Sequence, residues 1–205
     1  MIVIIDYDLG NLRSVQKAFE RIDCRASISR DIELLKKADK LVLPGVGHFA
    51  LGMMKLKEYG LVELLDHLVL EKRVPILGIC LGMQLMTKFS EEGMVQGLGW
   101  INADTVLFQK ESLPNHLKIP HMGWNSINSI SEHRILNDLT NDDQFYFVHS
   151  YSVKCQEKEH SLSTTEYGIV FDSGIIRENI VGVQFHPEKS HKAGLKLLKN
   201  FVNLE

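Results

Sequence analysis

The chain has 205 residues, of which 44% are hydrophobic and 24% charged, as expected for a globular protein with a sizeable core. Its net charge of −3 gives no electrostatic reason to bind nucleic acid or an anionic membrane surface. No apolar run approaches the length of a membrane span, and the three cysteines show no CxxC spacing. We therefore expect a cytoplasmic protein without a metal site, a nucleic-acid partner or a membrane partner.

The first part of the chain alternates between the patterns of strands and helices. Continuous apolar runs predict buried strands over residues 2–5, 24–29, 40–43 and 74–79. Apolar residues at helical spacing predict helices over residues 12–22, 32–38 and 51–71, the last one broken near Gly60. This alternation indicates parallel βαβ units with right-handed crossovers, and therefore an α/β fold with an open, mainly parallel sheet and helices on both faces.

From Trp100 onward the pattern changes to short β-rich runs separated by turn residues. The predicted strands cover residues 101–108, 117–119, 124–130, 144–148, 151–155, 161–166, 169–171 and 180–185. Asp172-Ser173-Gly174 is interpreted as a turn, and residues 191–204 as a final helix. These strands suit mixed or antiparallel additions to the sheet. Because no repeat or linker separates the two halves, we expect residues 1–205 to form a single domain.

One segment has the pattern of a nucleophile elbow. The apolar run ending at Ile79 breaks at Gly78-Ile79-Cys80-Leu81-Gly82, and a helix is predicted from Leu81. This is the strand–turn–helix context in which esterases place a nucleophilic serine, here replaced by Cys80. The two glycines would let strand and helix approach, and the helix N-terminus would favour a thiolate. The alternative is a buried structural cysteine.

Two other segments could complete a site around Cys80. The buried run 181–185 ends in His186-Pro187-Glu188, and extended geometry would place His186 and Glu188 side by side. Glu188 would then orient His186 as a base, as in a triad. Pro44-Gly45-Val46-Gly47 also follows a strand, and the N–H of Gly47 or its neighbour Val46 could form an oxyanion hole with that of Leu81. The alternatives are a structural histidine and an ordinary glycine turn.

Taken together and in this order, the three motifs resemble those of the class I (triad) glutamine amidotransferases. Further blocks resemble one branch of that family, the glutaminase subunits of imidazole glycerol phosphate synthase. These blocks are Asp6-Tyr7 with Gly10-Asn11-Leu12 and Ser14-Val15, then Pro120-His121-Met122-Gly123-Trp124-Asn125, Tyr146-Phe147-Val148-His149-Ser150-Tyr151 and Lys189-Ser190. The resemblance covers nearly the whole chain.

The resemblance implies that Cys80 attacks the side-chain amide of L-glutamine. His186 would then protonate the departing ammonia and activate water to hydrolyse the thioester, with Glu188 orienting the imidazole. No cofactor is implied. The residues implied to bind glutamine are Gln84, Glu92, His149, Ser150 and Tyr151, although Gln84 and Glu92 could equally be solvated helix residues.

The resemblance also implies a partner, because free ammonia would otherwise be lost to water. The partner would be a cyclase subunit with a (β/α)8 barrel, forming a heterodimer in histidine biosynthesis. The implied interface residues are Gly10, Asn11, Met122, Trp124, Asn125, Tyr146 and Lys189. Large side chains such as Trp124 are typical of interface anchors, with core packing as the alternative.

Some features favour other functions. Asp8 stands where the histidine-pathway enzymes commonly have a small residue, and Gly97-Leu98-Gly99-Trp100 resembles paralogues that supply ammonia for amino-sugar synthesis. A cysteine peptidase of similar fold is another possibility, as is a pseudo-amidotransferase that only binds its partner. Intact Cys80, His186 and Glu188 argue against the last.

Overall fold

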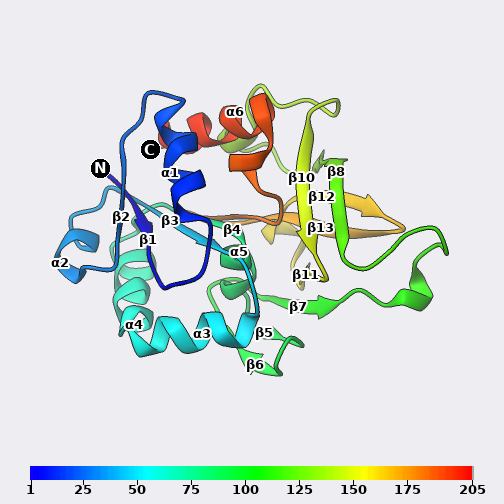
Figure 1. Cartoon of the computed structure of the whole chain (residues 1–205), viewed down its shortest axis with the longest axis horizontal. Helices are drawn as coiled ribbons and strands as arrows, with labels where there is room; N and C mark the ends of the chain where they lie inside the picture. The colour runs from blue at the N-terminus through cyan, green and yellow to red at the C-terminus, as the bar shows by residue number, and fades with distance from the viewer. Residues whose placement is uncertain (205) are drawn as a thin grey trace.

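The computed structural model describes residues 1–204 and is built around a twisted sheet (Figure 1). Its parallel strands are β1 (Ile2–Ile5), β2 (Ala26–Ser29), β3 (Lys40–Gly45), β4 (Ile76–Cys80) and β14 (Ile180–Val183). They lie in the order β2-β1-β3-β4-β14, so the last strand of the chain pairs with β4. The parallel core predicted from the first part of the chain is confirmed, and β14 from the second half also joins it in parallel.

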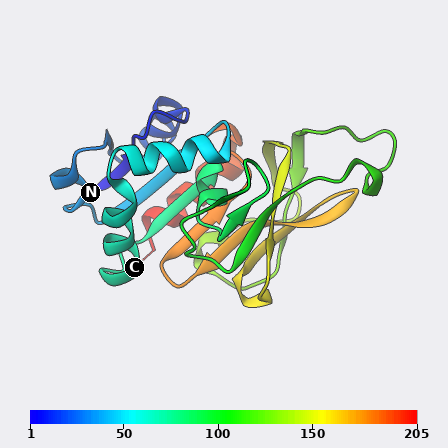
Figure 2. The same cartoon turned by 90° about the horizontal axis from the view of Figure 1, so that it is seen from below.

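Helices cover both faces of this sheet, as Figures 1 and 2 show. One face carries α1 (Leu12–Glu20) and α6 (His191–Val202), and the other carries α3 (Phe49–Glu58) and α4 (Leu61–Asp66). Strand β1 joins the two cores, because Ile2 and Ile4 pack on the first side and Val3 and Ile5 on the second. None of the helices in residues 1–204 is both long and apolar enough to cross a lipid bilayer.

The remaining helical segments are short. They are α2 (Ile32–Leu35), α5 (Leu81–Leu85), the π-helical turn η1 (His67–Glu71) and the 3₁₀ turns η2 (Lys110–Ser112), η3 (Arg134–Leu136), η4 (Lys158–His160) and η5 (Pro187–Lys189). The break near Gly60 is confirmed: this residue has a φ of 63° between α3 and α4, a conformation that glycine adopts without strain.

The second half of the chain extends the sheet with antiparallel strands, namely β11 (Tyr151–Cys155), β12 (Ser161–Tyr167), β13 (Ile169–Arg177), β7 (Ala103–Leu107) and the short β9 (Asn128–Ser129). Two short strands that precede Trp100, β5 (Phe89–Ser90) and β6 (Val95–Gln96), end the sheet: β5 pairs parallel with β7 and antiparallel with β6. Two further strands, β8 (His121–Ser126) and β10 (Gln144–His149), pair only with each other among the described strands.

Two predictions are wrong, and two short strands were missed. Residues 117–119 form no strand, and β5 and β6 were not expected. Residues 172–174 are not a turn, because β13 continues through them. The Asp172 carboxylate accepts hydrogen bonds from the Cys155 amide and the Ser161 hydroxyl, and a Cβ on Gly174 would lie 2.5 Å from Ser163 Oγ. These polar residues are therefore compatible with the strand interior.

The elbow between β4 and α5 depends on bare backbone. Cys80 lies at the junction with φ 54° and ψ −109°, a strained conformation for a residue with a side chain. A Cβ on Gly82 would lie 1.7 Å from the Leu43 carbonyl oxygen, and one on Gly78 would lie 2.8 Å from the Met83 nitrogen. The predicted steric reason for both glycines is confirmed.

We expect Gly82→Ala to lower the free energy of unfolding by at least about 2 kcal/mol, because its Cβ would clash with backbone that cannot move aside cheaply. Urea denaturation measures the change. The matched control is Gly52→Ala in α3, where the new methyl meets the ends of the Leu85 and Leu81 side chains and no backbone among its three nearest neighbours. Equal stabilities of the two variants would contradict this account of the elbow.

Candidate active site

The carboxyl ends of β3, β4 and β14 meet at one cavity of about 310 Å³. This is the edge of a parallel sheet at which ligand sites form in open α/β folds. The cavity is lined by every residue predicted for catalysis, the oxyanion hole or glutamine binding except Glu188: Val46, Gly47, Cys80, Leu81, Gln84, Glu92, His149, Ser150, Tyr151 and His186. Pro120 and Val148 also line it and were not predicted.

Glu188 lies behind the cavity and contacts His186. The distance from His186 Nδ1 to Glu188 Oε1 is 2.8 Å, and both side chains are only 2% exposed. The other ring nitrogen, Nε2, is buried and makes no hydrogen bond of ordinary geometry with the described residues. It is therefore free for the group that enters the cavity beside Cys80.

The His186–Glu188 pair is present, but it does not form through extended backbone as predicted. Residues 187–189 form the 3₁₀ turn η5 instead. Pro187 begins that turn, where its missing N–H costs nothing. The turn brings the carboxylate back to the ring instead of placing it alongside.

The neighbours of His186 favour its charged form. Burial lowers the pKa of His186, but the adjacent Cys80 sulfur and the Glu188 carboxylate outweigh this effect and raise the pKa to about 10. At neutral pH the ring is therefore an imidazolium between two groups that gain from its positive charge. An imidazolium at His186 is an acid placed beside the sulfur of Cys80.

The loop after β3 presents backbone to the same cavity. Gly47 has a φ of 113° in open space, and Val46 is 39% exposed. Neither amide donates a hydrogen bond to another backbone group in residues 1–204. Leu81 is the first residue of α5, so its N–H has no partner within the helix. These amides are available as oxyanion donors.

Gln84 and Glu92 are not solvated helix residues. Gln84 is 5% exposed, and its Nε2 donates to the Tyr151 carbonyl at 3.1 Å and to Gln184 Oε1 at 2.9 Å. Glu92 lies in a loop, where its Oε2 accepts from the Phe49 amide at 2.7 Å at the start of α3. Both side chains are thus held in fixed positions at the cavity wall.

Two buried histidines form a chain that ends at the cavity. His149 Nδ1 lies 2.8 Å from the Tyr151 carbonyl oxygen, so it must donate, and His149 Nε2 accepts from His121 Nδ1 at 3.0 Å. Burial is the largest effect on both rings: it lowers the pKa of His149 to about 3 and that of His121 to about 4. Both rings are neutral, and the hydrogen bonds define their tautomers.

Sequence reasoning missed two residues beside Cys80. Gln184 is fully buried, with Nε2 3.6 Å from Cys80 Sγ, and its spacing of two from His186 was a usable signal. Tyr7 is also fully buried, and its hydroxyl lies against Gly45 without a hydrogen-bond partner in the described chain. Burial, and to a lesser degree Cys80, raises the pKa of Tyr7. Tyr7 belongs to a block that carries the family resemblance, but no role was predicted for it.

Four of the seven predicted interface residues form one exposed patch, which we call the β8–β10 face: Met122, Trp124, Tyr146 and Lys189. Met122 is 60% and Trp124 47% exposed, so neither is a core residue. Tyr146 lies opposite Trp124 in the strand pair, and Lys189 Nζ is 5.5 Å from the Tyr146 ring centre.

The other three predicted interface residues are placed differently. The Asn125 side chain points to the opposite side of β8, where it donates to the Glu166 carbonyl at 2.9 Å. Gly10 is half-buried, and a Cβ there would lie 3.3 Å from the Pro44 carbonyl oxygen. Asn11 is exposed at the start of α1. Only Asn11 of these three presents an exposed side chain.

The structure explains how Asp8 fits at a position where the histidine-pathway enzymes commonly have a small residue. Its φ of 66° is the left-handed conformation that favours glycine. Ion pairs with Arg30 and Lys55 and a hydrogen bond from Tyr59 hold the Asp8 carboxylate, and the hydrogen bond from Arg30 is the largest of the effects that lower its pKa. An aspartate is therefore accommodated here by its neighbours.

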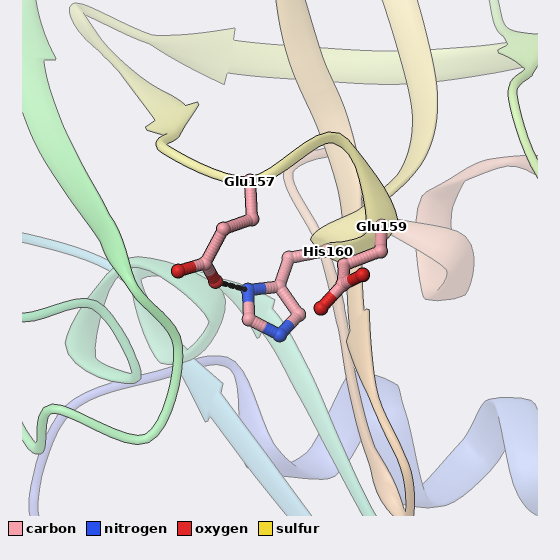
Figure 3. A group of neighbouring side chains, drawn as sticks. All are labelled: Glu157, Glu159 and His160. Atoms are coloured by element: carbon pink, nitrogen blue, oxygen red, sulfur yellow. Dashed lines mark ion pairs between the residues drawn. The ribbon is translucent and has the colours of Figure 1, made fainter.

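One group in the described part of the chain offers three possible metal ligands close together: Glu157, Glu159 and His160 (Figure 3). Glu157 already accepts from Asn102 and lies 2.8 Å from His160 Nδ1. Both glutamates are exposed, and Lys88 and Arg177 line the same hollow, where their charge opposes a cation. We assign this cluster to surface hydrogen bonding.

Comparisons with known proteins agree with this geometry. Residues 3–204 match the family model for the class I glutamine amidotransferases. The chain is 51% identical over 202 residues to the imidazole glycerol phosphate synthase subunit HisH 2 of Methanococcus maripaludis, covering 98% of each chain. It is 45% identical to the HisH 2 subunit of Pseudomonas aeruginosa over the full length of both. A solved glutamine amidotransferase, 17% identical, superposes with a TM-score of 0.76 over 98% of this chain and 97% of its own.

The neutral His149 ring predicts acid sensitivity. Its folded pKa lies below the unfolded value of 6.5, so its contribution to stability is present above pH 6.5 and is lost as the pH falls towards about 3. We expect His149→Gln to flatten the dependence of the unfolding free energy on pH between about 6 and 4, by up to about 1.4 kcal/mol per pH unit. Denaturant titrations at several pH values measure it. The exposed His116→Gln is the control, and identical slopes for the wild type and His149→Gln would contradict the prediction.

Proposed function

The chain belongs to the class I glutamine amidotransferases, and from this premise we propose that it is the glutaminase subunit of an imidazole glycerol phosphate synthase. In this function it hydrolyses L-glutamine to glutamate and ammonia and passes the ammonia to a cyclase subunit in histidine biosynthesis. Relatives named HisH, 40–51% identical over nearly the whole chain, support this assignment. The observation that carries the activity is Cys80 at the elbow, in one cavity with His186 and its partner Glu188.

The first half-reaction uses Cys80 as the nucleophile and His186 as the acid. The Cys80 thiolate attacks the side-chain amide carbon of glutamine, and the amides of Leu81 and of Val46 or Gly47 stabilise the resulting oxyanion. His186 Nε2 gives its proton to the amide nitrogen as the C–N bond breaks, so ammonia leaves and a glutamyl thioester remains. The raised pKa of His186 ensures that this proton is present at neutral pH.

In the second half-reaction His186 acts as a base, because acylation has removed the negative charge of the Cys80 sulfur. Acylation neutralises the sulfur, and His186 loses one of the two neighbours that raised its pKa. The neutral ring then accepts a proton from water through Nε2 while the water oxygen attacks the thioester carbon. The C–S bond breaks, glutamate leaves, and the sulfur becomes a thiolate beside an imidazolium again. Glu188 keeps Nδ1 protonated and the ring in place throughout.

Glutamine is held by groups whose own hydrogen bonds leave one atom free. Both Nε2 hydrogens of Gln84 are used, so its Oε1 is the acceptor available to the substrate. Glu92 has Oε1 free of partners within residues 1–204, and its charge suits the α-ammonium group. Residues 149–151 complete the wall of the cavity with backbone and hydroxyl groups.

Substitution of the nucleophile tests the activity. We expect Cys80→Ala to abolish the release of glutamate from glutamine, because no other group in the cavity can form the thioester. An assay for glutamate and ammonia measures the loss. The control, Cys24→Ala, changes a cysteine outside the cavity and should retain the wild-type rate. Residual turnover by Cys80→Ala above that of a protein-free blank would remove Cys80 from this role.

The proposed partner is a cyclase subunit with a (β/α)8 barrel, seated on the β8–β10 face. This face borders the cavity, because Val148 lines it from β10 and the Tyr146 carbonyl accepts from the His186 amide at 2.9 Å. A partner on this face would receive ammonia without its passage through bulk water. Exposed aromatic and methionine side chains are typical of the centre of an interface.

Trp124 is the expected anchor of that interface. We expect Trp124→Ala to weaken binding of the cyclase subunit by about 2 kcal/mol or more, since Trp124 is exposed in the isolated chain and would be buried in the complex. Isothermal titration calorimetry with the purified cyclase measures the loss. Val170→Ala is the control, because it changes an exposed apolar residue on β13 that lines a different hollow, with Val106 and Leu107. Unchanged affinity of Trp124→Ala would place the cyclase elsewhere.

A further inference from the structure

Gln184 contacts the sulfur of the proposed nucleophile. It follows β14 directly, is fully buried, and its backbone N–H donates to the Ser173 carbonyl at 2.9 Å. Its side-chain Nε2 lies 3.6 Å from Cys80 Sγ, within the range of hydrogen bonds to sulfur, and its Oε1 accepts from Gln84. Neither half-reaction requires this contact as described by the roles of His186, Glu188 and the oxyanion donors.

The orientation of the Gln184 amide follows from a backbone carbonyl. Nitrogen and oxygen of a side-chain amide have nearly the same shape, so hydrogen bonds must decide which atom faces which neighbour. The Tyr151 carbonyl can only accept, so the Gln84 atom 3.1 Å from it is Nε2. That Nε2 has a second hydrogen, which requires an acceptor at 2.9 Å, so Gln184 presents Oε1 to Gln84 and Nε2 to the sulfur.

Several titratable groups surround the sulfur or line the same cavity. His186, after β14, supplies the positive charge, and Tyr7, after β1, lies within electrostatic range as a neutral phenol. Glu92 and the neutral His149 lie in the wall of the same cavity. Gln184 is thus the neutral side chain that directs an N–H at Cys80 Sγ, and its substitution leaves the charged groups unchanged.

We propose that Gln184 is a catalytic residue whose amide N–H stabilises the Cys80 thiolate and holds the sulfur in position for attack, with Gln84 fixing the direction of that amide. The proposal rests on the proposed glutaminase activity for its role in turnover. The hydrogen bond to sulfur itself is testable without glutamine.

A donor to a thiolate has two opposing effects. It increases the fraction of the sulfur that is ionised near neutral pH, and it lowers the intrinsic reactivity of the ionised sulfur. Loss of the donor should therefore slow a thiolate reaction at neutral pH and leave it as fast or faster at high pH. General structural damage would not produce such a crossover.

The experiment follows alkylation of Cys80 by iodoacetamide from about pH 5 to about pH 10, with mass spectrometry of the peptide that contains Cys80. In this reaction the thiolate attacks the CH₂ carbon and iodide leaves. The variants are Gln184→Met, of similar length without a donor, and Gln184→Glu, which offers a carboxylate to the sulfur. The control is Thr165→Val, which removes a hydrogen bond of another buried side chain, to the Ser126 carbonyl.

We expect Gln184→Met to react about tenfold more slowly than the wild type near neutral pH and to equal or exceed it at high pH. Gln184→Glu should shift the profile further to high pH, because a carboxylate repels a thiolate. Thr165→Val should follow the wild-type profile. A Gln184→Met profile that matches the wild type, or that is slower by the same factor at every pH, would overturn the proposal.

Gln84→Met tests the orienting step. Without the Gln84 donor the Gln184 amide can rotate, so the profile should shift in the same direction as in Gln184→Met but by less. An unshifted profile would overturn the role of Gln84 in this proposal.

Glutamine turnover then separates this inference from the proposed function. In Gln184→Met we expect kcat to fall with a shifted pH profile, while KM stays within about twofold because Gln184 is absent from the cavity lining. A shifted alkylation profile in a protein that does not hydrolyse glutamine would contradict the proposed function alone. An unchanged alkylation profile in an active glutaminase would contradict the inference alone.

Discussion

The site depends on how closely α5 approaches the sheet. Gly82 lies against the Leu43 carbonyl of β3, and Met83 lies against Gly182 of β14, where a Cβ would come within 2.8 Å of its side chain. The short helix therefore contacts the strands on both sides of β4. This contact forces Cys80 into a strained backbone conformation with its sulfur at the cavity, and it places the Leu81 amide at the same point. A larger residue at any of these contacts would move the nucleophile relative to its base.

Much of this arrangement could be predicted, because each motif follows directly after an apolar run. Parallel strands share one carboxyl edge, so the Pro44–Gly47 loop, Cys80 and His186 had to meet once β3, β4 and β14 were adjacent. The adjacency of β14 to β4 spans about half of the chain. Periodicity reports only local structure, so it could not predict this adjacency.

The features that sequence reasoning missed are polar side chains satisfied by distant partners. Asp172 reads as a turn residue, yet it lies inside β13 because Cys155 and Ser161 donate to it. Gln184 is a polar residue in an apolar run, yet it is buried because Gln84, 100 residues away in sequence, donates a hydrogen bond to it. A sequence pattern records polarity and spacing but not the partner that compensates for burial. The burial of such residues can be recognised only when the tertiary contacts are known.

The proposed base and the proposed partner face are joined by a closed set of hydrogen bonds. The His186 amide donates to the Tyr146 carbonyl, the Tyr146 amide donates to Ser190 Oγ, and that hydroxyl donates to the His186 carbonyl. Together with Glu188, these bonds hold the imidazole rigidly. The Val46–Gly47 backbone at the same cavity lacks such bonds: Gly47 is exposed with a φ of 113°, and neither amide has a backbone partner in the described chain. A bound subunit can change the rate only through a group with more than one accessible arrangement. Regulation by a partner would therefore act on the Val46–Gly47 backbone, while His186 keeps its position.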